Sequence, residues 1–143
     1  NTPGIVGLGK AIELAPTINK EKIKKLRDYL WQQIQEKIKN VKLNGSLTNR
    51  TPNNLNVSFA KVEGESLLLA LDMEGIAVST GSACSSGSLE PSHVLMSIGL
   101  SHEQAHGSLR ITLGKGNTKE EIDYFIEKLK KAVERFRKMA PSR

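Results

Sequence analysis

The sequence predicts an α/β (α+β) two-layer sandwich, in which helices cover a small mixed or antiparallel sheet. Short segments with alternating apolar and polar residues are expected to be strands. They are separated by segments in which apolar residues recur at three- and four-residue steps, as in amphipathic helices. Both kinds of element have one apolar face to bury, and 143 residues suffice for one domain with its own core.

The first helix is predicted over 5–15, where apolar residues recur at helical steps between Pro3 and Pro16. A second helix is expected after Asn19, because an asparagine side chain suits the cap position. The apolar stripe of this second helix comprises Ile23, Leu26, Leu30, Ile34 and Ile38.

Strands are predicted over 41–43, before an Asn-Gly turn, and over 55–59, where apolar and polar residues alternate. Residues 65–74 are expected to form a helix that ends at Gly75. A further short strand is predicted over 76–78.

Beyond residue 90, two short helices are predicted, one started by Pro91 and one by a capping box over 101–104. The segment 109–113 alternates as a strand, with Arg110 on its polar side. A second capping box over 118–121 opens a long amphipathic helix. The inward residues of this helix are Ile122, Phe125, Ile126, Leu129, Val133 and Phe136.

Composition excludes several classes of protein. Apolar residues make up 38% and charged residues 25%, which is typical of a globular protein and not of a disordered one. A single cysteine excludes an internal disulfide and a multi-cysteine metal site, and favours a reducing, cytoplasmic location. No segment approaches the ~18 apolar residues of a membrane span, so no membrane association is expected.

The net charge of +6 is unevenly distributed. It is +5 over 20–42 and +4 over 115–143, but −3 over 43–114. The basic charge therefore lies on predicted helices, and aromatic residues, at 4%, do not interleave with it. Solvated helix faces explain this pattern better than nucleic-acid binding does, and an acidic protein partner is an alternative.

Cys84 is the most informative residue of the chain. It lies in the segment 80–88, where every other residue is Gly, Ser, Ala or Thr. Such a segment is expected to be an exposed, mobile loop, because it can neither bury apolar surface nor hold a regular helix. A thiol on such a loop could carry a nucleophile to a substrate, or it could be an inert loop cysteine. The residues alone leave both interpretations open.

Arg110 is the only charged residue in the strand predicted around it. Its planar guanidinium could bind a carboxylate through two parallel hydrogen bonds, or it could simply be solvated. His102 and His106 lie just upstream as candidate acid or base groups near a thiol, although lone histidines are more often surface residues. No metal-ligand spacing and no phosphate-binding loop appears, so no metal site is predicted.

Several segments, taken together, carry a family resemblance. They are Val78–Ser85, Ser88–Ser92 and Ala105–Gly114, with Asn56–Phe59, Val62–Leu68 and Asn1–Gly7. In these segments the chain closely resembles the carboxy-terminal part of the NifS/IscS-type cysteine desulfurases. The resemblance covers essentially the whole chain, and the segment around the cysteine is its most specific part.

The resemblance implies a pyridoxal-phosphate enzyme, a sulfur transferase of the aspartate-aminotransferase superfamily, that converts L-cysteine to L-alanine. The sulfur would remain as a persulfide on Cys84, and Arg110 matches the arginine that holds the substrate carboxylate. The persulfide sulfur would pass to an acceptor protein, such as an iron–sulfur scaffold, for cluster or thio-cofactor assembly. The intact enzyme is expected to be a homodimer, and the fold to match the small domain of fold-type I pyridoxal-phosphate enzymes.

The family's cofactor lysine and most of its phosphate site belong to a large amino-terminal domain that this sequence does not contain. Residues 1–143 are therefore expected to be a single domain, the carboxy-terminal small domain of a longer enzyme. Alone, this domain is expected neither to bind the cofactor nor to turn over cysteine. The alternative function is a stand-alone persulfide carrier or binding module, and the base that activates Cys84 stays open.

Overall fold

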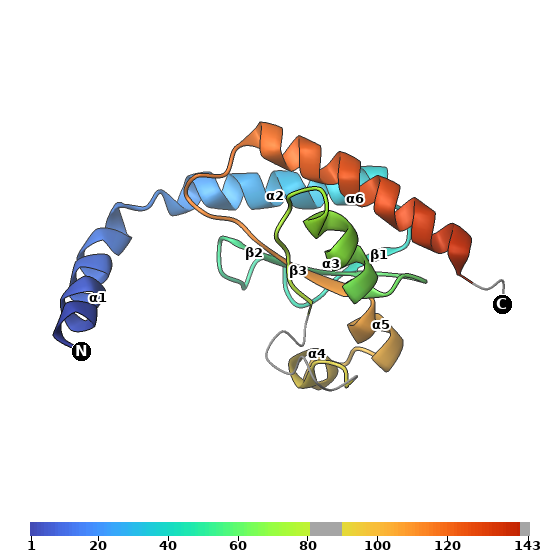
Figure 1. Ribbon diagram of the computed structural model, residues 1–143, viewed down its shortest axis with the longest axis horizontal. Coiled ribbons are helices and arrows are strands. Elements are labelled where there is room, and N and C mark those ends of the chain that lie inside the picture. The colour runs from blue at the N-terminus through green and yellow to red at the C-terminus, as the bar shows by residue number, and fades with distance from the viewer. Residues whose placement is uncertain (81–89, 141–143) are drawn as a thin grey trace.

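A computed structural model of the chain describes residues 1–80 and 90–140. Helices and strands are interspersed along these residues (Figure 1). In chain order they are α1 (Thr2–Leu14), the 3₁₀ helix η1 (Ala15–Thr17), α2 (Lys20–Lys37), β1 (Val41–Leu43), β2 (Asn54–Phe59), α3 (Gly64–Asp72), α4 (His93–Ser97), α5 (His102–His106), β3 (Ser108–Thr112) and α6 (Lys119–Met139). Within these ranges, no helix has both the length and the apolar character needed to span a bilayer.

Strands β1, β2 and β3 form an antiparallel sheet in that order within the described part of the chain. Because side chains alternate between the two faces of a strand, this sheet has an apolar face and a polar face. The buried side chains of the apolar face include Leu55, Val57, Phe59, Leu109 and Ile111. On the polar face, Asn56 of β2 lies directly opposite Arg110 of β3. The predicted strands over 55–59 and 109–113 are confirmed.

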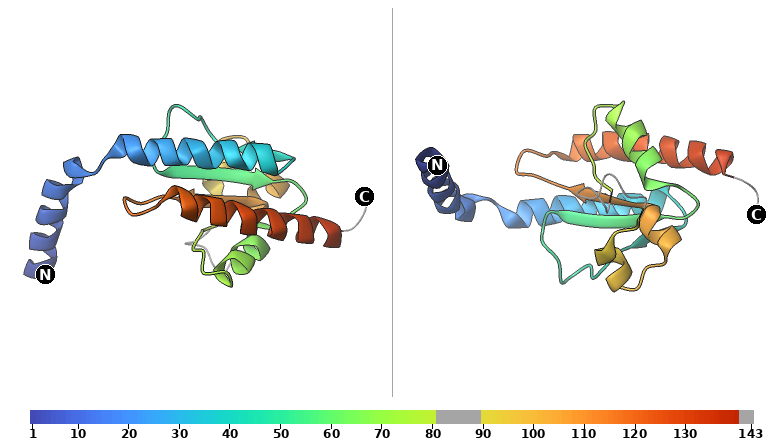
Figure 2. Two further views of the ribbon diagram at one scale, coloured as in Figure 1. Left: turned by 90° about the horizontal axis from the view of Figure 1, so that it is seen from above. Right: turned by 60° about the horizontal axis from the view of Figure 1, so that its bottom comes forward.

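Helices α2 and α6 pack side by side against the apolar face of the sheet (Figures 1 and 2). Helix α3 packs against α6 and β3. The core they share includes Leu30, Ile34, Leu67, Ile126 and Leu129. Helix α5 contacts β2, and α4 packs on α5 below the sheet in Figure 1. The predicted two-layer α+β sandwich, with an antiparallel sheet, is confirmed.

Three helices begin at the capping residues that the sequence indicates. The Asn19 side chain accepts a hydrogen bond from a backbone N–H of the first turn of α2 at 2.9 Å. Ser101 and Gln104 form the capping box of α5, and Thr118 and Glu121 form that of α6. Each cap provides an acceptor for an N–H group that would otherwise have no partner within the helix.

Residues 76–78 do not form a strand, which corrects the prediction. Helix α3 is followed by Gly75, whose φ of 74° lies in the left-handed region. The chain then meets the edge of β3 only at Ser79, which forms an isolated bridge with Arg110. Ile76 and Val78 pack against the core instead of pairing regularly with β3. The apolar run is thus explained by side-chain burial and not by a sheet ladder.

Two helices are more exposed than their apolar residues suggest. Helix α1 has no buried residue and extends away from the body of the domain (Figures 1 and 2). Its exposed large apolar side chains are Ile5, Val6, Leu8, Ile12 and Leu14. In the region predicted as a helix from Pro91, Leu95 is buried but Val94 and Ile98 are exposed. Helix α1 therefore offers an apolar surface that the described residues do not cover.

Close backbone contacts fix the start of β3. A Cβ atom at Gly107 would lie 2.8 Å from the carbonyl oxygens of Phe59 and Val62. A Cβ atom at Gly64 would lie 2.6 Å from the carbonyl oxygen of Ser108. Only glycine allows backbones to approach so closely. These two glycines hold β3 against the end of β2 and the start of α3, and so determine where Arg110 lies.

We expect Gly107→Ala to destabilise the fold by about 2 kcal/mol, a fall of roughly 5 °C in Tm. The added methyl group would clash with backbone atoms, which cannot move aside as a flexible side chain can. Thermal unfolding of the chain measures the effect. Gly116→Ala is the matched control, because a Cβ atom there meets no atom within 4 Å. Equal Tm values for the two variants would contradict the packing argument.

Candidate active site

Arg110 lies on the polar face of the sheet, with its side chain exposed. Its backbone N–H and C=O groups exchange two hydrogen bonds with Ser79, at 2.6 and 3.1 Å. Its Nη2 atom donates to the Ser79 hydroxyl oxygen at 3.3 Å. Over the described ranges, no carboxylate forms an ion pair with this guanidinium. The structure therefore presents a charged, planar donor group to solvent, which is the arrangement that carboxylate binding requires.

A row of polar side chains crosses the sheet at the level of Arg110. Ser79 lies on one side of Arg110 and Asn56 on the other. Beyond Asn56, Asn44 follows β1 and donates its backbone N–H to the Asn56 carbonyl at 2.9 Å. The Asn44 side-chain amide nitrogen lies 2.6 Å from Asn56 Oδ1 and 2.8 Å from the Ser58 hydroxyl oxygen. We call Ser79, Arg110, Asn56 and Asn44 the polar row.

Cys84 lies outside the described residues, so its role stays a prediction. The described chain leads toward it through Ser79 and Thr80. Five residues after Ser79, a fully extended chain has covered at most about 18 Å. The length of the chain between Ser79 and Cys84 therefore limits the distance between the Cys84 thiol and Ser79, the residue that pairs with Arg110.

The two candidate histidines lie on α5, at its first and last residues, and both are exposed. His106 is close enough to Glu63, the N-cap of α3, to act on its charge. Partial burial acts to raise the pKa of Glu63, but hydrogen bonds from Ser66 and Glu65 and the His106 charge together lower it. His106 is therefore placed beside the start of α3, and neither histidine belongs to the polar row. Their acid or base roles stay predictions.

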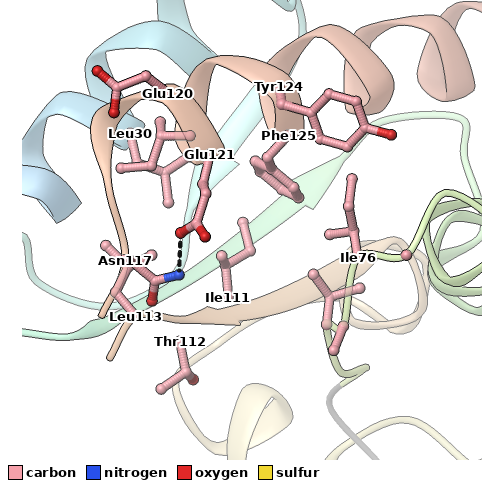
Figure 3. Close-up of a pocket in the computed structure, with 14 residues that line it drawn as sticks. Leu30, Ile76, Ile111, Thr112, Leu113, Asn117, Glu120, Glu121, Tyr124 and Phe125 are labelled. Atoms are coloured by element: carbon pink, nitrogen blue, oxygen red, sulfur yellow. Dashed lines mark hydrogen bonds between the residues drawn. The ribbon is translucent and has the colours of Figure 1, made fainter. Parts of the chain in front are cut away.

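A groove of about 560 Å³ lies between residues 75–78, β3 and the first turns of α6 (Figure 3). Its walls are mainly apolar, and carboxylates of Glu120 and Glu121 lie at the start of α6. A hydrogen bond from the Asn117 side chain, together with one from the backbone of Thr118, lowers the pKa of Glu121. An ionised carboxylate there repels an anionic substrate. The groove contains none of the predicted site residues, so the candidate site is the polar row.

No lysine lines this groove, although a lysine that forms a Schiff base with pyridoxal phosphate needs a defined pocket. Lys42, on the polar face, is exposed and donates to Gln104 Oε1 at 3.4 Å. Within residues 1–80 and 90–140, no cluster of three His, Cys, Asp or Glu side chains could hold a metal ion.

Sequence reasoning singled out Arg110 but missed Ser79, Asn56 and Asn44. The alternation over 55–59 already placed Asn56 on a polar strand face. The alternation did not predict the register of the strands, which places Asn56 opposite Arg110 and Ser79 at the other edge of β3. Polar residues at matching positions of two predicted strands, and of the segments beside them, were the signal that could have been sought.

Comparison with known proteins assigns this chain to a family. The model of the aminotransferase class-V family matches residues 1–125. The chain belongs to this family. Among its curated relatives, a protein from Clostridium botulinum (strain Hall) named cysteine desulfurase IscS is 58% identical over 147 residues. One from Dictyoglomus turgidum with the same name is 54% identical over 144 residues.

The alignments cover 99% of this chain but only 37% and 36% of those two relatives. A solved structure described as a NifS-like protein matches 94% of the chain with a TM-score of 0.79 and 34% sequence identity, covering 34% of that structure. A NifS-like protein from Rickettsia africae matches 81% of the chain with a TM-score of 0.67, 31% identity and 29% coverage. The resemblance to NifS/IscS-type cysteine desulfurases is therefore confirmed, for a chain that spans about a third of their length.

Proposed function

We propose that this chain is the carboxy-terminal small domain of a pyridoxal-phosphate-dependent cysteine desulfurase. The observation that carries the proposal is the pairing of Arg110 with Ser79. It joins an exposed guanidinium on the polar face to the segment that continues toward Cys84. The identity to cysteine desulfurases over 99% of the chain supports the same function.

In the proposed reaction, L-cysteine and the Cys84 thiol give L-alanine and a Cys84 persulfide. The Cβ–S bond of the substrate breaks, and a bond forms between the substrate sulfur and Cys84 Sγ. The electron pair of the broken bond stays with Cβ, which takes up a proton. Pyridoxal phosphate, bound by other residues of the full-length protein, supplies the electron sink for this chemistry. The sulfur then passes to an acceptor protein.

The residues of this chain have two roles in the proposal. Arg110 binds the substrate carboxylate through charge-assisted hydrogen bonds and so orients the substrate. Cys84 is the nucleophile, and it attacks as a thiolate. With an ordinary thiol pKa of about 8.5, only a minority of the group is ionised at neutral pH, so a base or a positive charge must assist.

The exposed apolar residues of α1 support the assignment to a longer protein. Its five large apolar residues, which include Ile5 and Ile12, are each at least 50% exposed. Burying such a surface is favourable at about 25 cal/mol per Å². We propose that α1 packs against the large domain of the same enzyme. The intact enzyme is proposed to be a homodimer.

The test of the proposed function uses the full-length protein. We expect absorbance near ~420 nm from a bound pyridoxal cofactor. We also expect L-alanine and transferable sulfur to appear in equal amounts when L-cysteine is added. A stand-alone persulfide carrier would accept sulfur from another protein without forming alanine from cysteine. That second result would contradict the proposal.

A further inference from the structure

Asn56 occupies a distinctive place on the polar face of the sheet. It is the direct cross-strand partner of Arg110, and their backbone hydrogen bonds point away from each other, toward Asn44 and Ser79 respectively. In such a non-hydrogen-bonded antiparallel pair the Cβ atoms are only about 4.5–5.5 Å apart. The two side chains are therefore close neighbours on the same face. What Asn56 does there depends on which end of its amide group points toward Arg110.

A chain of hydrogen bonds determines that orientation. The backbone carbonyl of Gln104 can only accept, so the Ser58 hydroxyl donates its single proton to it, at 2.7 Å. The Ser58 oxygen can then only accept, and it receives a hydrogen bond from the Asn44 amide nitrogen at 2.8 Å. The same nitrogen lies 2.6 Å from the side chain of Asn56, which must therefore present its oxygen to Asn44.

The opposite orientation of the Asn44 amide group is disfavoured. Asn44 is only 4% exposed, and its Oδ1 atom has no hydrogen-bond partner among the described residues. Turning the amide over would place this oxygen against the Ser58 oxygen, whose proton is already used. Two acceptors would then face each other at hydrogen-bond distance. The fold leaves one buried oxygen unpaired and thereby fixes the amide of Asn56.

With its oxygen held on the β1 side, Asn56 directs its NH₂ group away from β1. The neighbour on that other side is Arg110. Two donor groups, a guanidinium and a primary amide, then stand side by side on the exposed polar face. Such a pair repels a cation and suits an anion with two oxygen atoms.

We propose that Asn56 is a second carboxylate-binding residue, which donates its side-chain N–H to the substrate carboxylate held by Arg110. The proposal deepens the proposed function and rests on it. Asn44 and Ser58 act as positioning residues, because they hold the Asn56 amide in the donor orientation. Through Ser58, this orientation depends on the backbone of α5.

The test measures ligand binding in the full-length protein with Asn56→Ala. L-alanine and ethylamine are the probes, because they differ only by the carboxylate group. We expect the inhibition constant of L-alanine to rise about tenfold, the loss typical of one hydrogen bond to a charged group, while that of ethylamine stays the same. Asn54→Ala is the matched control, since Asn54 lies on the same strand and face but opposite Thr112. It should change neither constant.

Three results would overturn the inference, and they are distinguishable. If Arg110→Ala weakens L-alanine binding and Asn56→Ala does not, then Asn56 takes no part and the proposed function stands. If Arg110→Ala also leaves L-alanine binding unchanged, the carboxylate site itself is wrong. A general structural defect in Asn56→Ala would weaken both probes equally, which also contradicts a specific donor role.

Discussion

Replacing Cys84 with serine in the full-length protein should reduce the formation of L-alanine from L-cysteine by roughly a thousandfold or more. A hydroxyl group is far less ionised than a thiol at neutral pH, and it is a poor acceptor for the sulfur atom. Substrate binding should be nearly unchanged, because Arg110 and not Cys84 holds the carboxylate. Alanine formation and the inhibition constant of L-alanine separate the two effects.

Ser82→Ala is the matched control for this variant. It changes one hydroxyl group two residues from Cys84 and should leave alanine formation close to its original rate. If Cys84→Ser forms alanine as fast as this control, another group accepts the sulfur. The assignment of the nucleophile would then be wrong.

Replacing Arg110 with alanine should raise the KM for L-cysteine by about a hundredfold. The variant loses a positive charge and two hydrogen bonds to the carboxylate, each of the charge-assisted kind. Arg110→Lys should recover only part of the loss, because an ammonium group cannot bind both oxygen atoms in parallel. Steady-state kinetics over a range of L-cysteine concentrations gives KM and kcat separately.

Lys42→Ala is the control for the loss of charge. Lys42 is also an exposed cation on the polar face, paired with Ser58 on β2. It should change KM by less than about twofold, because distant exposed charges interact weakly in water. A KM in Arg110→Ala equal to that in Lys42→Ala would show that the guanidinium does not bind the substrate.

The helices were predictable because their signals are local. Asn19 and the two capping boxes mark helix starts within four residues, and apolar steps of three and four mark the buried sides of α2 and α6. The alternation in β2 and β3 likewise assigned each residue to a face. These features depend on neighbours in the sequence, so no knowledge of tertiary contacts was needed.

The candidate site could be predicted only in part. Arg110 was identified as an isolated charge on a strand, but its partners Ser79 and Asn56 are 31 and 54 residues away in the sequence. Their convergence depends on register, which alternation alone does not fix. The same limit explains why the strand predicted over 76–78 was wrong. A run of apolar residues indicates that side chains are buried, but it does not show whether the segment pairs with the edge of a sheet. Cys84 was identified from its unusual surroundings and from a family resemblance.

The most direct test is the mass of the peptide that contains Cys84, taken from the full-length protein after brief exposure to L-cysteine without a sulfur acceptor or reductant. A gain of one sulfur atom on that peptide, reversed by thiol reduction and matched by one L-alanine per chain, is the predicted result. Stoichiometric alanine with the added sulfur on a different peptide, or with none on Cys84, would contradict the account.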